Sequence, residues 1–155
     1  IVGELMKGFC LQRRLSAADR ARFSDSDDAL IADQLQYGLP AISLVSHSAL
    51  ITAIANDIAG DMIFAQQVWG IGRDGDVLLA ISTSGQSKNV INAAKTGRAR
   101  GLGVIGLTGQ SGGALRALCD VVITVPSNDV ALIQEMHLPI YHALCRQLEA
   151  HYFGD

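Results

Sequence analysis

The 155-residue sequence is poor in aromatic residues, in charged residues and in cysteine, and each shortage excludes a class of protein. Aromatic residues make up 5% of the chain, too few for an aromatic-rich all-β module. Charged residues make up 17%, which excludes a chain kept disordered by its charge. The net charge of −3 offers no basic surface for bulk nucleic acid or an anionic membrane. No apolar run approaches the ~18 residues of a membrane span.

The few cysteines are scattered. Cys10, Cys119 and Cys145 form an odd set with no C-x-x-C pair. Such a set argues against a disulfide framework or a thiolate zinc site and favours small buried side chains in a reducing compartment. We therefore expect a cytoplasmic protein.

Apolar residues are plentiful, at 49% of the chain, and most of them are small and aliphatic. Short apolar runs alternate with stretches of helical spacing, which predicts β-α-β units and a parallel sheet. The strands are expected at residues 41–45, 77–82, 102–107 and 121–125, and the helices at 30–37, 48–56, 61–71, 87–100, 112–118 and 129–151. The runs are apolar on both faces, as in a sheet covered by helices on both sides. The fold class is therefore α/β, a three-layer, Rossmann-like doubly wound sandwich.

The two ends of this pattern differ from its middle. Residues 1–9 already have helical spacing, which indicates a helix entered part-way and an upstream segment outside this chain. The polar stretch 16–28 is the least core-like part and is expected to form a surface excursion. The length corresponds to one domain of about 150 residues.

The first segment that could carry chemistry is STSGQS, residues 82–87, between an expected strand and an expected helix. Ligands of open α/β sheets bind beyond the carboxyl ends of the strands, and a helix start attracts anions. Four hydroxyl groups and one glycine fall within these six residues. An ordinary helix cap needs only one hydroxyl, which Ser87 could supply. The surplus favours a phosphate or sugar-phosphate site over a simple cap.

A second segment, GLGVIG at residues 101–106, matches the dinucleotide pattern G-x-G-x-x-G only in its letters. A dinucleotide fingerprint follows a strand and opens a helix, whereas these glycines lead into a strand. Gly101 fits better as the residue that ends the preceding helix. No nicotinamide cofactor is expected.

The last expected helix collects Gln134, Glu135, His137 and His142 within nine residues. At about 100° per residue, His142 lies about 20° from Glu135 and about 140° from His137, so the two histidines do not form a metal pair by themselves. Each histidine alone is more often a surface or core residue, but the clustering favours a site. Pro139 is expected to loosen or kink the helix.

Glu4 is one of three glutamates and lies among apolar residues. A partly buried carboxylate would have a raised pKa and could act as a general base. Taken alone, Glu4 is more simply a solvated helix position.

Together these segments resemble the SIS (sugar isomerase) domain family, and within it the D-sedoheptulose 7-phosphate isomerases, or phosphoheptose isomerases. The matching stretches are VGELMKGF, AIANDIAGDMIFAQQV, GDVLLAISTSGQSKNVINAAKTGRARGLGVIGLTG and IQEMHLPIYHALC. The resemblance implies a single SIS domain over residues 1–155 that lacks an N-terminal helical segment. It also implies a ketose–aldose isomerase that acts through an enediol and needs no redox cofactor.

The resemblance assigns roles by motif. The substrate phosphate would bind Ser82, Thr83, Ser84 and Ser87, and Asp57 would contact the sugar. Glu4 and His142 would be the catalytic pair, assisted by Gln134. In members that bind zinc, Glu4, Gln134 and His142 would be ligands, together with a histidine whose position falls upstream of Ile1.

The sequence departs from the family pattern at three places. The family's other serine-rich loop, before the helix of the catalytic glutamate, is absent from this chain. The stretch 13–37 is longer than in the best-known members. The Asp-Arg pair that often precedes the I-Q-E motif is replaced by Ala131 and Leu132.

Three functions remain open at this point. The first is isomerisation of sedoheptulose 7-phosphate to D-glycero-D-manno-heptose 7-phosphate, for heptose synthesis. The second is a non-catalytic scaffold, as in a relative that associates with the bacterial replication initiator, and the third is a sugar-phosphate sensor. The joint presence of Glu4, Gln134 and His142 favours the enzyme. The apolar last helix and the family resemblance also imply a homo-oligomer, a tetramer, with its site between subunits.

Overall fold

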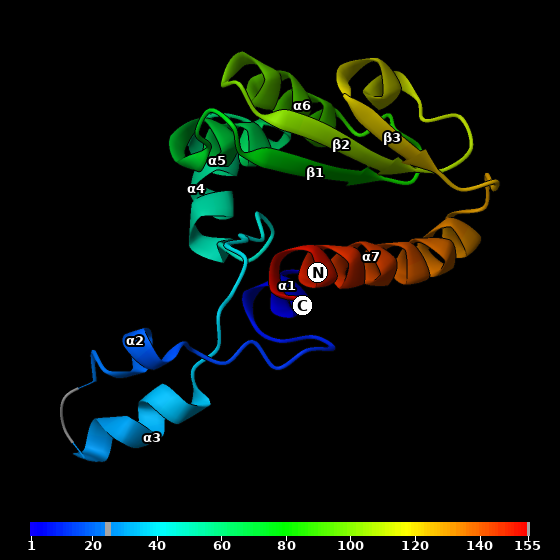
Figure 1. Ribbon diagram of the computed structural model, residues 1–155. Coiled ribbons are helices and arrows are strands. Elements are labelled where there is room, and N and C mark those ends of the chain that lie inside the picture. Colours follow the sequence, from blue (N-terminus) through cyan, green and yellow to red (C-terminus); the bar gives the residue numbers. More distant parts are fainter. Residues whose placement is uncertain (24–25, 155) are drawn as a thin grey trace. The chain divides into compact units, whose positions relative to one another are not determined.

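The computed structural model describes residues 1–23 and 26–154 (Figure 1). The chain divides into two compact units, which are described separately. The sheet unit is Ser43–Leu138, and the terminal unit combines Ile1–Ile42 with Pro139–Asp155. No helix in the described part of the chain is both long enough and apolar enough to cross a membrane.

The sheet unit is built on three parallel strands in the order β1-β2-β3. These are β1 (Val77–Ser82), β2 (Gly103–Thr108) and β3 (Val121–Thr124). β1 pairs with β2 from Val77 opposite Gly103 to Ser82 opposite Thr108. The carboxyl ends of β1 and β2 therefore meet at one edge of the sheet, where ligands of such sheets bind.

Helices surround this sheet, namely α4 (Ser48–Asp57), η1 (Gly60–Met62), α5 (Ile63–Ile71), α6 (Lys88–Ala99) and η2 (Ala114–Leu118). α6 packs against β1, β2, α5 and η2. Its buried face consists of Ala93, Ala94 and Gly97. Small side chains let the helix approach the strands closely, and the core beneath it contains Ala80, Val104 and Leu115.

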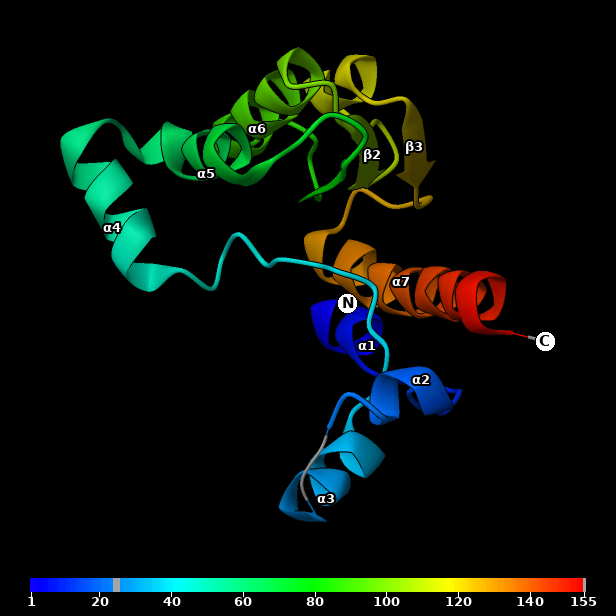
Figure 2. The ribbon, with the colours of Figure 1, turned by 60° about the vertical axis from the view of Figure 1, so that its left-hand side comes forward.

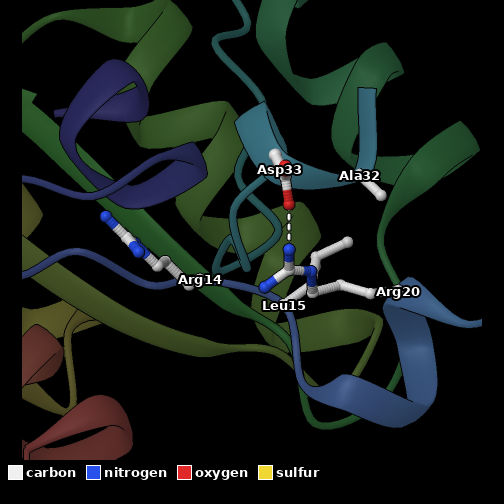
Figure 3. Close-up of a pocket in the computed structure, with 5 residues that line it drawn as sticks. All are labelled: Arg14, Leu15, Arg20, Ala32 and Asp33. Carbon is white, nitrogen blue, oxygen red and sulfur yellow. Dashed lines mark hydrogen bonds and ion pairs between the residues drawn. The ribbon is translucent and has the colours of Figure 1, made fainter. Parts of the chain in front are cut away.

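The terminal unit contains α1 (Val2–Met6), α2 (Ala17–Arg20), α3 (Ser26–Gln34) and the second half of α7 (Val130–Phe153). Figure 2 shows α2 and α3 in turned view. An isolated bridge between Arg14 and Gln36 closes the base of the excursion that carries these two helices. A small cavity of about 270 Å³ lies there, lined by Arg14, Leu15, Arg20, Ala32 and Asp33, with an ion pair between Arg20 and Asp33 (Figure 3).

The structure confirms the expected parallel sheet. It also confirms the helix before β1, which is α5, and the helix after it, which is α6. It also confirms the interpretation of Gly101, which has φ +79° just after α6, while Gly103 and Gly106 lie in β2. The expected excursion at residues 16–28 forms α2 and the start of α3, and its residues 24–25 lie outside the described residues.

Three expectations about the elements were wrong. Residues 41–45 form no strand and have no partner strand in the described sheet, and the Leu44 carbonyl accepts a bond from Gln67 Nε2 at 3.0 Å. α1 ends at Met6, so the helical spacing up to Phe9 does not continue as a helix. The helix expected at 30–37 is α3, which begins earlier and ends at Gln34.

Candidate active site

The hydroxyl-rich residues 82–87 form the turn between β1 and α6. Ser82 is buried at the end of β1, and its Oγ accepts the N–H of Gly85 at 3.1 Å. The same Oγ lies 3.1 Å from Ser87 Oγ. The side chains of Ser84 and Ser87 are exposed. The turn therefore presents hydroxyl groups to solvent at the edge where the strands end.

Gly85 gives this turn its shape. Its φ of +64° is a conformation that favours glycine, and a Cβ there would lie 2.0 Å from the carbonyl oxygen of Gly112. The Gly85 carbonyl accepts the N–H of Leu115 at 3.0 Å. Thr83 is tied to the following loop in the same way, since its carbonyl accepts the N–H of Gly109 at 2.9 Å. The hydroxyl-rich turn is thus fixed against residues 109–115.

The start of α6 completes the arrangement. Ser87 occupies the cap position of this 12-residue helix, but its hydroxyl makes no capping bond and contacts Ser82 instead. The first N–H groups of a helix lack partners within the helix and carry a partial positive charge. Helix N–H groups beside several hydroxyls make a site suited to a phosphate. The simple-cap interpretation of Ser87 is therefore wrong.

Glu4 and His142 both belong to the terminal unit, Glu4 on α1 and His142 on α7. The His142 ring is half-buried between Phe9, at 5.6 Å between ring centroids, and Tyr141, at 4.4 Å. The Glu4 side chain is 27% exposed. The unit thus holds a carboxylate and an imidazole that both reach solvent.

Positive charge on His142 lowers the pKa of Glu4, against the raised pKa that its apolar neighbours in the sequence suggested. Burial raises the pKa only slightly, because the side chain is partly exposed. The carboxylate is ionised at neutral pH and can accept a proton.

A cavity of about 330 Å³ opens beside His142 and is lined by Phe9, Pro139, His142, Ala143 and Arg146. Most of this lining is apolar, and Arg146 supplies a cation one helical turn beyond His142. The volume lies at the lower end of the range for small-molecule sites.

The remaining candidates lie in the sheet unit. Asp57 is the exposed last residue of α4, and Gln134 is exposed on the first half of α7. His137 is buried, at 6% exposure, and its Nε2 lies 3.2 Å from the carbonyl oxygen of Thr108. The structure therefore gives His137 a core position, while His142 keeps an exposed edge.

The described residues contain no group of three or more His, Cys, Asp or Glu side chains that could hold a metal ion. Glu4 and His142 are two donors in one unit. Protein zinc sites use at least three protein ligands. The residues described here do not complete a zinc site, so no chemical step is assigned to zinc.

The sequence analysis did not single out two residues of the terminal unit that prove to be buried and charged. Arg13 and Glu149 form an ion pair at 2.8 Å with side chains that are 0% and 1% exposed. They lie 136 positions apart, and most of their partners are backbone atoms. The one sequence signal for the burial of Glu149 is its position between apolar residues, on a helix otherwise rich in Leu and Ala.

The comparison with known families decides the assignment of this fold. A family model described as the SIS domain matches residues 31–109, which include β1, the hydroxyl-rich turn, α6 and β2. The chain belongs to the SIS domain family. The resemblance drawn from the sequence motifs is confirmed.

Relatives of this SIS domain chain are named phosphoheptose isomerases. One from Bradyrhizobium sp. (strain BTAi1) is 48% identical over 115 residues, which cover 74% of this chain and 58% of the relative. Another, from Nitratidesulfovibrio vulgaris, is 49% identical over 107 residues, covering 69% of this chain and 51% of the relative. The chain thus spans little more than half the length of these curated relatives.

Solved structures give the same result for the SIS domain fold. A phosphoheptose isomerase from Francisella tularensis matches with a TM-score of 0.70 and 43% identity, over 72% of this chain and 60% of that one. A phosphoheptose isomerase from Neisseria gonorrhoeae matches with a TM-score of 0.66 and 41% identity, over 84% and 69%. The α/β fold class with a parallel sheet is confirmed.

Proposed function

We propose that the protein is an aldose–ketose isomerase that interconverts D-sedoheptulose 7-phosphate and D-glycero-D-manno-heptose 7-phosphate. The observation that carries this proposal is the turn at residues 82–87, where exposed hydroxyls of Ser84 and Ser87 stand beside the uncapped start of α6. That arrangement suits the phosphate of a sugar phosphate. The identity of 48% to a protein named phosphoheptose isomerase supports the choice of sugar.

In this proposal the sheet unit binds the substrate. Ser82, Thr83, Ser84 and Ser87 hold the phosphate, and the exposed polar side chains of Asp57 and Gln134 contact the sugar chain. The hydroxyls donate hydrogen bonds to phosphate oxygens, and the helix start contributes N–H groups and a partial positive charge.

Glu4 and His142 carry out the proton transfers. The ionised Glu4 carboxylate takes a proton from the carbon next to the ketose carbonyl, while the His142 imidazolium gives a proton to the carbonyl oxygen. The resulting enediol collapses in the opposite sense: His142 removes the proton of the neighbouring hydroxyl, and Glu4 returns its proton to the former carbonyl carbon. Atoms and electrons balance within the sugar, so no redox cofactor takes part.

The proposed enzyme works in the cytoplasm as a homotetramer. The described cysteines, Cys10, Cys119 and Cys145, are all free thiols, as suits a reducing compartment. Assembly would cover the apolar side chains that α7 exposes, among them Leu132 at 48% and Tyr152 at 61%.

The proposal is tested by incubating the complete protein with sedoheptulose 7-phosphate in D₂O and following the sugar by NMR. We expect aldose signals to grow and the proton at the carbon next to the carbonyl to be replaced by deuterium. Unphosphorylated sedoheptulose is the matched control and should not react. Tight binding of the sugar phosphate without conversion would support the sensor, and absence of both binding and conversion would support the scaffold.

A further inference from the structure

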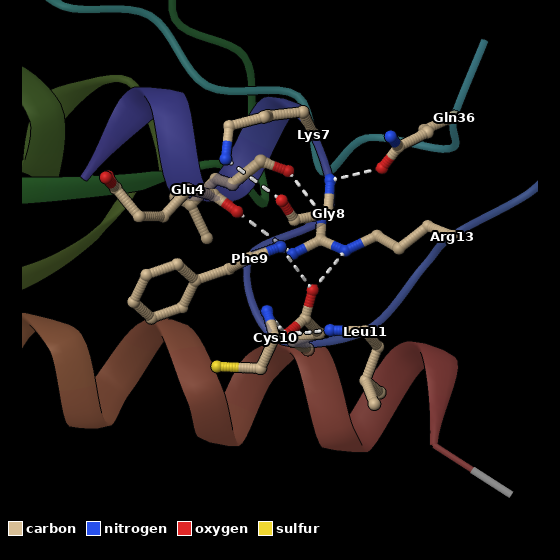
Figure 4. A network of polar contacts seen from close by, with 10 residues as sticks. Glu4, Lys7, Gly8, Phe9, Cys10, Leu11, Arg13 and Gln36 are labelled. Atoms are coloured by element: carbon tan, nitrogen blue, oxygen red, sulfur yellow. Dashed lines mark hydrogen bonds and ion pairs between the residues drawn. The ribbon is translucent and has the colours of Figure 1, made fainter. Parts of the chain in front are cut away.

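A buried ion pair links the segment that follows Glu4 to the helix that carries His142 (Figure 4). Arg13 Nε donates to Glu149 Oε1 at 2.8 Å, and both side chains are almost completely shielded from solvent. Removing two charges from water is costly, and an apolar pair of similar volume often stabilises a protein as well or better. An apolar pair, however, could not bond the backbone groups around this place, so the two charges hold that backbone in position.

The Glu149 carboxylate organises the backbone that leads away from α1. It accepts the N–H groups of three consecutive residues, Phe9 at 2.7 Å, Cys10 at 2.7 Å and Leu11 at 3.1 Å. Glu149 lies seven residues after His142 on α7, which places both at nearly the same angle around the helix, about 20° apart. The Phe9 ring, held by the first of these bonds, packs against His142.

The Arg13 guanidinium reaches the other catalytic residue. Its Nη2 donates to the carbonyl oxygen of Glu4 at 3.0 Å, and its Nη1 donates to the carbonyl oxygen of Leu5 at 2.6 Å. α1 has only five residues, too few to be stable as a helix without outside contacts. Arg13 thus supplies partners for carbonyl groups that the end of a short helix leaves free.

We propose that Arg13 and Glu149 are positioning residues that set the Glu4 carboxylate relative to the His142 imidazole. Neither residue touches substrate in this scheme. The hydrogen bonds of Arg13 fix the backbone of Glu4. The hydrogen bonds of Glu149 fix the backbone of Phe9, whose ring packs against His142. The inference rests on the proposed function, because the positions matter for catalysis only if Glu4 and His142 transfer protons. A misplacement of about 1 Å can lower a rate about 100-fold.

The test uses Glu149→Gln and Arg13→Lys in the complete protein. For both variants we expect kcat for sedoheptulose 7-phosphate to fall about 10- to 100-fold, with KM changed less than about twofold. Arg14→Lys is the matched control, because Arg14 is exposed and its Nε donates to Gln12 Oε1 at 3.0 Å. The kcat of this control variant should stay at the wild-type value. The NMR signals of the His142 ring, shifted by the nearby Phe9 ring, should move in the first two variants and not in the control.

A double variant, Arg13→Gln with Glu149→Gln, separates positioning from folding. It removes both charges, so it should unfold at a higher temperature than a single variant that leaves one charge unpaired. A glutamine at position 13 is too short to bond both carbonyls of α1, so kcat should remain low although stability returns. Recovery of kcat together with stability would overturn the inference, as would wild-type kcat in either single variant. An inactive wild-type protein would instead refute the proposed function, and with it this catalytic role.

Discussion

At the scale of single residues, the two histidines of α7 show how burial separates a structural from a chemical role. His137 is almost fully buried and bonded to the Thr108 carbonyl, which also accepts the N–H of Val125 at 3.1 Å. His142 is half-buried and borders a cavity. The sequence placed them on different faces of one helix, and their contacts differ accordingly.

Replacing the proposed catalytic pair should abolish most activity. Glu4→Gln removes the proton acceptor and His142→Ala removes the acid, so each should lower kcat by about 10²–10⁴-fold. His137→Ala serves as the comparison: it leaves a cavity that should cost on the order of 2 kcal/mol of stability, with a much smaller loss of kcat. Steady-state kinetics and thermal unfolding of the three variants distinguish these effects. An active His142→Ala enzyme would refute the assignment.

The pH dependence of stability should report on Glu149. Burial raises its pKa, but the hydrogen bonds from Phe9, Cys10, Leu11 and Arg13 outweigh that effect, and the pKa lies below its usual 4.5. A carboxyl with a lowered folded-state pKa stabilises the protein above its unfolded pKa, and this contribution is lost as pH falls through the folded pKa. The difference in unfolding temperature between wild type and Glu149→Gln should therefore be constant near neutrality and shrink below pH 4.5. Circular dichroism melts between about pH 3 and pH 7 test this; a constant difference down to the lowest pH would contradict it.

At the scale of elements, the sequence predicted what local pattern determines. The strand at residues 77–82 was located to the residue, because an apolar run between a turn and a serine-rich stretch leaves little choice. The prediction of a strand at residues 41–45 was wrong. A strand needs a neighbouring strand to bond its backbone, and no local sequence pattern reveals that neighbour. The same limit applies to the site. The hydroxyl-rich turn was visible in six residues, whereas the bonds of Arg13 and Glu149 depend on contacts across 136 positions.

The hydroxyl-rich turn should bind phosphate through its side chains. Replacing Ser84 and Ser87 by Ala removes two exposed hydroxyls and leaves the buried Ser82 in place. Affinity for sedoheptulose 7-phosphate should weaken by roughly 1–3 kcal/mol for each lost hydrogen bond to the charged phosphate, with little change in stability. Isothermal titration of wild type and the double variant measures the loss. Unchanged affinity would reduce the turn to a connection between β1 and α6.

The shape of that turn should depend on Gly85. Gly85→Ala places a Cβ against the Gly112 carbonyl in a backbone conformation that costs about 1–2 kcal/mol for residues other than glycine. Gly75→Ala is a matched control, because Gly75 has φ +86° but no atom within 4 Å of an added Cβ. The stability of the control variant should fall only by the cost of the backbone conformation. Gly85→Ala should lower stability further and should also weaken phosphate binding. Equal losses in denaturant unfolding of the two variants would show that the contact with residues 112–113 is unimportant.

At the scale of the whole molecule, the exposed apolar surface of α7 bears on assembly. This 24-residue helix exposes Val130, Leu132, Met136, Leu138, Leu148 and Tyr152 to between 36% and 61%. Large exposed apolar surfaces usually mark an interface, and homo-oligomers with closed symmetry are the commonest way to cover them.

We expect the complete protein to be a homotetramer at micromolar concentration by multi-angle light scattering. Leu148 and Tyr152 are four residues apart and form one exposed stripe on the last turns of α7. Leu148→Lys combined with Tyr152→Lys should shift the mass to smaller species, because lysine ammonium groups are costly to bury. Gln147→Lys adds one such charge at the adjacent exposed position and should leave the tetramer intact. A monomeric wild type would refute the tetramer, and a double variant that stays tetrameric would show that this end of α7 lies outside the interface.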